Sequence, residues 1–179
     1  KAPLVDSYGR AIKNVRISVT DKCNFRCVYC MPAEGLQWLK KDQILSFEEI
    51  ERLTRVLVSM GIEQVRLTGG EPTVRKDLPL LVNKLSQIEG LKSLSLTTNG
   101  YLLKNLAKPL AEAGLTRINV SIDSLVRDRF FELTRRDSLQ QVLEGLEELE
   151  KYPSITPIKI NAVAMKNFTE QEVAGFAQL

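Results

Sequence analysis

Residues 15–30 read Val-Arg-Ile-Ser-Val-Thr-Asp-Lys-Cys-Asn-Phe-Arg-Cys-Val-Tyr-Cys. The first five residues alternate apolar and polar side chains, which predicts a strand with one apolar and one polar face. A loop with three cysteines follows directly, and the chain has no others. The spacing C-x3-C-x2-C supplies three thiolates. Because each iron of a [4Fe–4S] cluster normally takes one thiolate, three cysteines would leave one iron open to bind a small molecule.

Similar β-rich segments recur at 64–67, 93–97, 117–122 and 158–163, with helical patterns between them. Ser46 and Glu49 form a capping box before one predicted helix, and Gly61 ends it. Further helices are predicted at 77–88, 103–113 and 139–149, and Thr169 is a candidate cap for another. Repeated strand–helix–strand units indicate an α/β fold with a parallel sheet and right-handed crossovers.

Each predicted strand has a polar row opposite its apolar row, as in Arg117, Asn119 and Ser121 against Ile118 and Val120. An ordinary closed (β/α) barrel fills its interior with branched apolar side chains. The polar rows therefore favour a partial (β/α) barrel, open and lined for a large polar ligand. The alternative is an open sheet with one hydrated face.

Polar and glycine-rich motifs follow the predicted strands at the end where α/β folds place their sites. Besides the cysteine loop, they are Thr-Gly-Gly-Glu-Pro at 68–72, Thr-Thr-Asn-Gly at 97–100 and Ser-Ile-Asp at 121–123. Glycine lets a backbone approach a neighbour closely because it has no Cβ. These loops are expected to meet at one rim.

The composition excludes several classes of protein. The net charge of +3 is too small to indicate nucleic acid, and the chain has no histidine for His triads or His-ligated zinc. It has no apolar run long enough to span a membrane and no secretory pattern at its start. An odd, clustered set of cysteines predicts a reducing, cytoplasmic location. The missing initial Met and the helical pattern at the end suggest a fragment.

The cysteine spacing and the Gly-Gly-Glu-Pro loop resemble the radical S-adenosylmethionine (SAM) superfamily. The stretches 6–10, 15–32, 65–72, 96–100, 117–123 and 158–161 are similar to the molybdenum cofactor biosynthesis protein A family. The resemblance implies a radical SAM partial barrel over 1–179, truncated after about five strand–helix units. It also implies a lyase, GTP 3′,8-cyclase, that converts GTP to (8S)-3′,8-cyclo-7,8-dihydroguanosine 5′-triphosphate. In that family a [4Fe–4S] cluster and SAM generate a 5′-deoxyadenosyl radical.

The resemblance also assigns site residues. The cluster ligands would be Cys23, Cys27 and Cys30. The SAM contacts would be Tyr29, Gly70 and Ser121, with Glu71 and Asn99 added from the same rim. The GTP contacts would be Arg16, Arg66, Thr97 and Lys159, which also fall in the polar rows. Three cations on one face suit a triphosphate. No catalytic acid or base is assigned.

Simpler interpretations stand beside these assignments. The cysteines could hold zinc with Asp21 as a fourth ligand, in a non-enzymatic metal-binding module. Tyr29 could pack against its neighbours, and Glu71 could cap a helix. Arg16 or Arg66 could pair with Asp123, and Lys159 could extend to solvent. A radical SAM enzyme could also act on a peptide or another substrate.

The family has a C-terminal region whose three cysteines hold a second [4Fe–4S] cluster, and this chain has no cysteine after Cys30. We therefore expect this chain to assemble the SAM cluster but not to complete the cyclisation alone. The expected partners are GTP, SAM and an electron donor. A downstream pyranopterin synthase and a second copy in a homodimer are further candidates, whereas nucleic acid and membrane are not expected.

Overall fold

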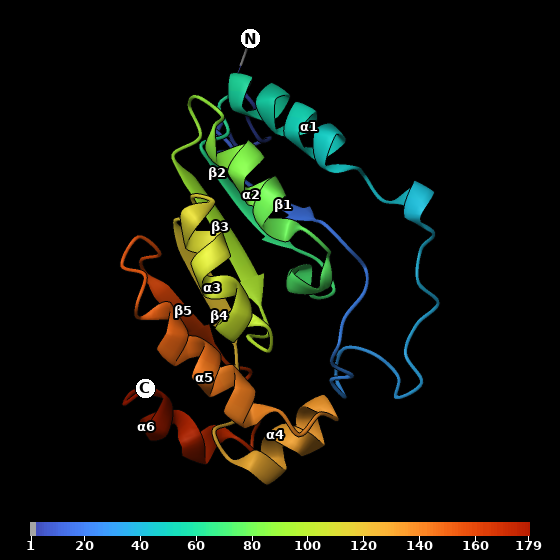
Figure 1. The fold of residues 1–179 in the computed structure, drawn as a ribbon, viewed down its shortest axis with the longest axis vertical. Coiled ribbons are helices and arrows are strands. Elements are labelled where there is room, and N and C mark those ends of the chain that lie inside the picture. Colours follow the sequence, from blue (N-terminus) through green and yellow to red (C-terminus); the bar gives the residue numbers. More distant parts are fainter. Residues whose placement is uncertain (1–2) are drawn as a thin grey trace.

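A computed structural model describes residues 3–179, and its centre is one parallel five-stranded sheet. The strands lie side by side in chain order, so β1 and β5 form the two edges (Figure 1). This is a partial (β/α) barrel that stays open between its first and last strands. The strands are β1 (Asn14–Ser18), β2 (Gln64–Thr68), β3 (Ser93–Thr98), β4 (Arg117–Ser121) and β5 (Ile158–Asn161).

The α-helices are α1 (Phe47–Ser59), α2 (Leu78–Ser86), α3 (Leu103–Glu112), α4 (Arg127–Thr134), α5 (Leu139–Leu149) and α6 (Val173–Phe176). Helices α1, α2, α3 and α5 connect successive strands and lie on one side of the sheet, whereas α4 lies beyond the ends of the strands and α6 follows β5 (Figure 1). Short 3₁₀ helices are η1 (Lys41–Gln43), η2 (Pro72–Val74) and η3 (Glu170–Glu172).

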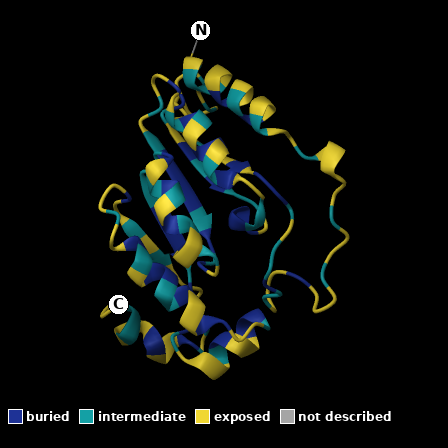
Figure 2. Cartoon of the chain, in the orientation of Figure 1, coloured by how far each residue is buried: buried dark blue, intermediate teal, exposed yellow. Residues whose placement is uncertain are grey.

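The alternation in the strands separates the core from the open face. In β2, Val65 and Leu67 are buried, whereas Gln64 is exposed and Arg66 is half-buried. The apolar rows of the strands pack with the inner faces of the helices, and the outer faces of the helices are exposed (Figure 2). Burial of these rows is the main favourable term for the fold.

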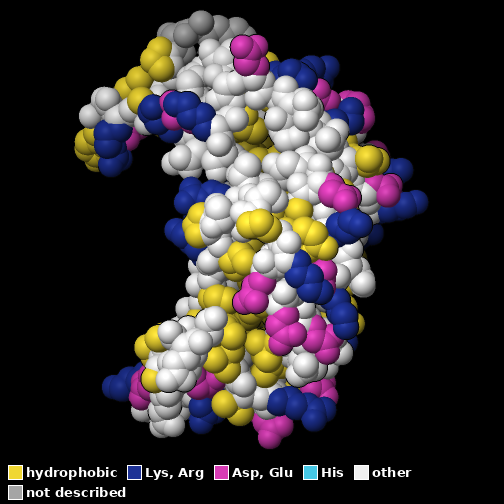
Figure 3. All heavy atoms as spheres, turned by 60° about the vertical axis from the view of Figure 1, so that its left-hand side comes forward, with side chains coloured by type: hydrophobic (Ala, Val, Ile, Leu, Met, Phe, Trp, Pro, Cys, Tyr) yellow, Lys and Arg dark blue, Asp and Glu magenta, His cyan; other side chains and the backbone are white. Residues whose placement is uncertain are grey.

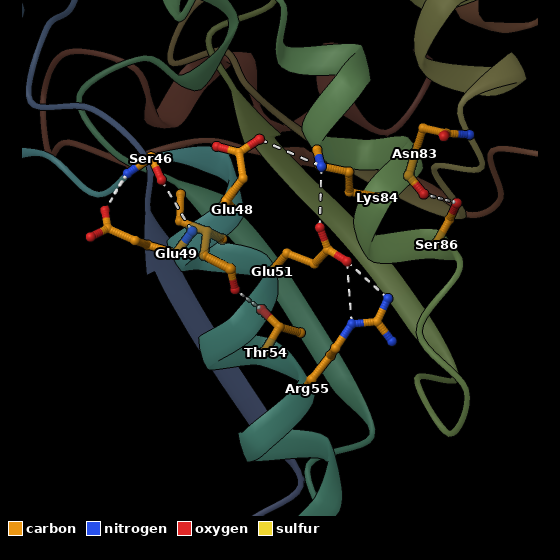
Figure 4. Close-up of polar contacts among 10 residues, drawn as sticks. Ser46, Glu48, Glu49, Glu51, Thr54, Arg55, Asn83, Lys84 and Ser86 are labelled. Carbon is orange, nitrogen blue, oxygen red and sulfur yellow. Dashed lines mark hydrogen bonds and ion pairs between the residues drawn. The ribbon is translucent and has the colours of Figure 1, made fainter.

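The N-terminal end of α1 forms as the sequence predicts. The backbone N–H of Glu49 donates to Ser46 Oγ at 3.1 Å, and the N–H of Ser46 donates to Glu49 Oε2 at 2.7 Å. Farther along, Lys84 of α2 pairs with Glu48 at 3.5 Å and with Glu51 at 3.3 Å, which links the two helices (Figure 4). Such pairs near the surface add little stability.

Helices α3 and α5 approach closely because α5 has glycine at the contact. A Cβ on Gly145 would lie 2.8 Å from Leu103 Cβ and 2.9 Å from the carbonyl oxygen of Gly100. Both distances are too short for packed atoms, so a larger residue would force the helices apart. The glycine inside this helix is therefore explained by packing.

Several sequence expectations differ from the structure in detail. The sequence analysis does not predict helix α4, because the helix is short and half of its residues are charged. Asp77 precedes α2 in a left-handed conformation and makes no side-chain cap. Thr169 also makes no cap, because its hydroxyl bonds to Val163 and Met165 instead. The last predicted strand ends at Asn161, two residues early.

Charged side chains of both signs are mixed on the face drawn in Figure 3, in keeping with the small net charge. Large single-sign fields are therefore absent from that view. Within residues 3–179, none of the helices is long and apolar enough to cross a membrane.

Candidate functional site

The strand register aligns the polar side chains in rows across the open face of the sheet. Arg16 is level with Arg66, which is level with Ser95, which in turn is level with Arg117. Thr97 is level with Asn119, and Asn119 with Lys159. The four residues predicted to contact GTP therefore lie in two adjacent rows on the same face.

The cations of these rows lack acidic partners. Among residues 3–179, no carboxylate lies within ion-pair distance of Arg16, Arg66, Arg117 or Lys159. Among the described residues, the Arg66 side chain makes a single long hydrogen bond, from Nε to Ser95 Oγ at 3.4 Å. A pocket of about 200 Å³ lies between Arg16, Arg66 and Ser95. Unpaired guanidinium groups around a pocket favour an anionic ligand.

The three cysteines lie in the loop that leaves β1. Cys23 and Cys27 are half-buried, whereas Cys30 is exposed. Burial raises the pKa of Cys27 to about 11, and the negative charge that Cys23 carries once it ionises adds to the shift. Burial likewise raises the pKa of Cys23. Both thiols are therefore protonated near neutral pH and would lose a proton when they bind metal.

The three cysteines have the chemistry that an iron–sulfur cluster needs, because its ligands are thiolates. Within the described residues, no three His, Cys, Asp or Glu side chains form a ready-made metal site, so a cluster would have to draw the thiols together. Asp21, the candidate fourth ligand of a zinc site, accepts the N–H of Leu39 through Oδ2. Its Oδ1 is buried and has no hydrogen-bond partner among these residues.

The Gly-Gly-Glu-Pro loop packs against the start of the cysteine loop. The N–H of Gly70 donates to the carbonyl oxygen of Thr20 at 2.8 Å, and the N–H of Glu71 to that of Lys22 at 2.7 Å. A Cβ on Gly69 would lie 2.3 Å from the carbonyl oxygen of Thr20, and one on Gly70 would lie 2.4 Å from that of Lys22. The close approach that needs these glycines is therefore to the protein's own backbone.

The Glu71 side chain joins the loops after β2 and β3. It is 2% exposed and accepts hydrogen bonds from Thr98 Oγ1 at 2.6 Å, the N–H of Asn99 at 2.7 Å, and both the N–H and hydroxyl of Thr73. Burial raises the pKa of Glu71, and these donors oppose the rise. The helix-capping interpretation matches this geometry, and a contact with SAM stays a prediction.

Asn99 and Tyr29 connect the cysteine loop to other strand ends. Asn99 Nδ2 donates to Asn24 Oδ1 at 2.8 Å. The hydroxyl of Tyr29 donates to Asp123 Oδ2, and Asp123 Oδ1 accepts the N–H of Val163 at 2.9 Å. Burial and then the bond to Asp123 raise the pKa of Tyr29. The cysteine loop is thus tied to the ends of β3, β4 and β5.

The structure brings most predicted SAM residues to one rim, with Ser121 half-buried at the end of β4 beside Asn161. It also shows residues that the sequence assignment left out. Asp123 is 6% exposed and holds Tyr29, so it does not pair with Arg16 or Arg66. Arg117 lies in the same row as Arg16 and Arg66, as the strand register shows. Its place on a polar strand face was visible in the sequence, but its neighbours were not.

Comparisons with known proteins identify the family of the chain. A family model described as the radical SAM superfamily matches residues 17–179. A GTP 3′,8-cyclase of Peptoclostridium acidaminophilum is 46% identical over 179 residues, covering 100% of this chain and 55% of the relative. One from Geobacter sulfurreducens is 48% identical over 98% of this chain and 54% of the relative. The molybdenum cofactor biosynthesis protein moc-5 of Caenorhabditis elegans is 45% identical, and the match covers 99% of this chain and 29% of the relative.

Solved structures share the fold. SuiB of Streptococcus suis bound to S-adenosylmethionine superposes with a TM-score of 0.72 at 20% identity, over 92% of this chain and 37% of that one. The structure of anSMEcpe with bound AdoMet has a TM-score of 0.68 at 21% identity, and the match covers 93% of this chain and 45% of that one. The chain spans about half the length of the curated cyclases that it matches. With the family model matched over residues 17–179, this chain belongs to the radical SAM superfamily.

Proposed function

We propose that this chain is the radical SAM portion of a GTP 3′,8-cyclase of molybdenum cofactor biosynthesis. The observation that carries the proposal is the 46–48% identity to GTP 3′,8-cyclases along nearly all of the chain. Because the chain spans about half of those relatives, complete turnover is expected to need residues beyond these 179.

In this proposal Cys23, Cys27 and Cys30 hold a [4Fe–4S] cluster with one iron open to SAM. The bound pair would supply one-electron, hydrogen-abstracting chemistry. The chain's own contribution is placement. The bonds from Gly70 and Glu71 to the backbone at Thr20 and Lys22 hold the start of the cysteine loop against β2. In this proposal SAM would be contacted by residues at the same rim, namely Tyr29, Gly70, Glu71, Asn99 and Ser121.

The unpaired cations on the sheet support GTP as the substrate. Arg16 and Arg66 are level on adjacent strands, and a triphosphate can accept bidentate bonds from both. Lys159 and Thr97 lie in the next row, on either side of Asn119. A peptide substrate would leave these positive charges unmatched, so the row favours a polyphosphate.

The proposal has further parts that rest on the relatives. An external electron donor would reduce the cluster, and a pyranopterin synthase would use the product. A second [4Fe–4S] cluster would need cysteine ligands from outside this sequence, because Cys30 is its last cysteine. A homodimer and a cytoplasmic location also remain predictions.

The substrate is tested by removing the cations from the face. A variant with Arg16→Ala, Arg66→Ala and Lys159→Ala should lose GTP binding in calorimetry and keep SAM binding by the reconstituted chain. The matched control is Arg52→Ala, Arg55→Ala and Lys108→Ala, which removes equal charge from the exposed faces of α1 and α3. Unchanged GTP affinity in the first variant would refute the substrate assignment.

The cofactors are tested by anaerobic iron–sulfide reconstitution and electron paramagnetic resonance of the reduced chain. A [4Fe–4S]⁺ signal that changes on addition of SAM is expected. One zinc per chain without sulfide would instead support the metal-binding module.

A further inference from the structure

The C-terminal end of α4 meets the cysteine loop, although about 100 residues separate them in the sequence (Figure 1). The N–H of Arg26 donates to the carbonyl oxygen of Thr134 at 3.0 Å, and the N–H of Val28 to that of Leu133 at 2.8 Å. The last carbonyls of a helix have no partner within the helix. The cysteine loop supplies those partners, so loop and helix end stabilise each other.

Two arginines directly after α4 add side-chain bonds to the same loop. Arg135 Nη1 donates to the carbonyl oxygens of Arg26 at 3.0 Å and Met31 at 3.3 Å. Arg136 Nε donates to that of Asn24 at 2.9 Å. The carbonyls of Arg26 and Met31 lie on either side of Cys27 and Cys30 in the sequence, and Asn24 directly follows Cys23. The two side chains thus hold the loop on both sides of its cysteines.

The backbone conformation of Arg135 is one that glycine usually adopts. Its φ of 54° and ψ of 29° are left-handed, at the helix end where glycine is usual. A non-glycine residue in this conformation is strained, and such strain persists where the surroundings require that residue. Within residues 3–179 the Arg135 guanidinium has no carboxylate partner, so an ion pair does not explain it. The bonds to the cysteine loop are its only side-chain hydrogen bonds there.

Aromatic packing also joins the cysteine loop to α4. Phe25 of the loop is 3% exposed, and its ring packs edge-on against Phe130 of α4, with the centroids 5.9 Å apart. It also packs edge-on against Tyr101, at 6.1 Å. Phe25 anchors one point of the loop, and the arginines fix its path on either side of that anchor.

We propose that Arg135 and Arg136 are positioning residues that fix the backbone path of the cysteine loop, so that only the thiols have to draw together when the cluster binds. The inference rests on the proposed cluster at Cys23, Cys27 and Cys30. The arginines touch loop carbonyls and not the thiols, so they act through the loop. Without them the loop stays attached at Phe25, but the cysteines have to be ordered while the cluster binds.

The first test is amide hydrogen exchange in the metal-free chain with Arg135→Gly. Glycine suits the left-handed backbone, so global stability in urea should not fall. The two lost bonds should speed exchange of the Arg26 and Val28 amides roughly tenfold. Arg136→Gln, on an ordinary backbone, should act in the same direction. Unchanged exchange at these amides, or an equal increase throughout the chain, would overturn the proposal.

Two further variants separate the roles of charge and geometry. Arg135→Lys keeps the backbone conformation and the charge and can still donate to a carbonyl, so loop protection should lie between those of Arg135→Gly and the unsubstituted chain. Arg127→Gln removes a guanidinium from α4. In the unsubstituted chain this guanidinium pairs with Asp137 and not with the cysteine loop. The substitution should leave exchange at Arg26 and Val28 unchanged, and faster exchange there would count against a specific clamp.

The second test is iron–sulfide reconstitution at limiting iron. Arg135→Gly and Arg136→Gln should take up cluster several-fold more slowly than the unsubstituted chain and show a broadened resonance signal, with recovery in Arg135→Lys. Equal rates and signals would overturn the role in cluster assembly. If the unsubstituted chain itself takes up no cluster, the proposed function fails, whereas the exchange result still decides whether the clamp exists.

Discussion

The polar face of the sheet and the cysteine loop are positioned by different forces. On the sheet, Arg16 and Arg66 are level because the backbone hydrogen bonds of β1 and β2 set their register. In the loop, Cys23, Cys27 and Cys30 are ordered by bonds from Glu71, Asn99, Asp123 and α4, which lie 40 to 110 residues away. Single substitutions should therefore leave the sheet geometry intact but disorder the loop.

The largest expected effect is at the cysteines. Cys27→Ser replaces one of three thiolate ligands by a hydroxyl, which is a poor ligand for iron, so the SAM-responsive resonance signal should disappear. Iron and acid-labile sulfide per chain measure the loss. Val28→Ala, next to it on an exposed side chain, is the control and should keep both. A full cluster in Cys27→Ser would show that the thiolates are not the ligands.

Glu71→Ala should break the side-chain link between the loops after β2 and β3, next to the cysteine loop. It leaves buried donors from Thr73, Thr98 and Asn99 unpaired, which should lower the free energy of unfolding by at least about 3 kcal/mol. Urea unfolding measures this. The isosteric Glu71→Gln keeps the shape and one acceptor, so its loss should be smaller. Equal stability of Glu71→Ala and the unsubstituted chain would show that these hydrogen bonds do not stabilise the fold.

A single cation on the sheet should matter for the ligand and not for the fold. Arg16→Ala removes charge-assisted bonds to a phosphate, which should weaken GTP binding roughly 10- to 100-fold. Because Arg16 is exposed and unpaired, the urea midpoint should stay the same. Arg117→Ala shows whether the third arginine of that row also contacts the ligand. A fall in stability without a change in affinity would mean that Arg16 is structural.

The smallest effect is expected at the C-terminal segment, where Glu172 bonds to the loop after β4. Its Oε2 accepts the N–H of Leu125 at 2.6 Å, both carboxylate oxygens bond to Ser124 Oγ at 2.9 Å, and Arg129 pairs with it at 3.1 Å. Burial opposes ionisation, but these partners together hold the pKa of Glu172 below 4.5.

Because its pKa is lowered in the fold, ionised Glu172 stabilises this attachment above about pH 4.5, and the contribution fades as the pH falls through the folded-state pKa. Amide exchange in residues 163–179, corrected for its intrinsic pH dependence, should rise as the pH falls below the ordinary titration range of a glutamate. Glu172→Gln should abolish this pH dependence. A transition of the same size in that variant would assign it to another group.

Much of the architecture could be predicted from local patterns. The alternation in 64–67 and 117–122, the capping box at Ser46, and helix-ending glycines such as Gly61 act over a few residues, and all appear in the structure. Helix α4 could not be found this way, because Phe130 and Leu133 are its only fully buried apolar residues and its start has no side-chain cap. Its stability comes from contacts with distant segments, which are the cysteine loop, α5 and Glu172.

The sequence by itself determined the parallel α/β sheet, its polar face and the grouping of the three cysteines, because side-chain period and ligand spacing are properties of adjacent residues. Only the tertiary structure decided that Glu71 and Asp123 join separate loops, that Arg117 lies level with Arg66, and that Arg135 and Arg136 hold the cysteine loop. These contacts join residues far apart in the chain. They depend on strand register and on the direction of loop backbones, which short-range patterns do not encode.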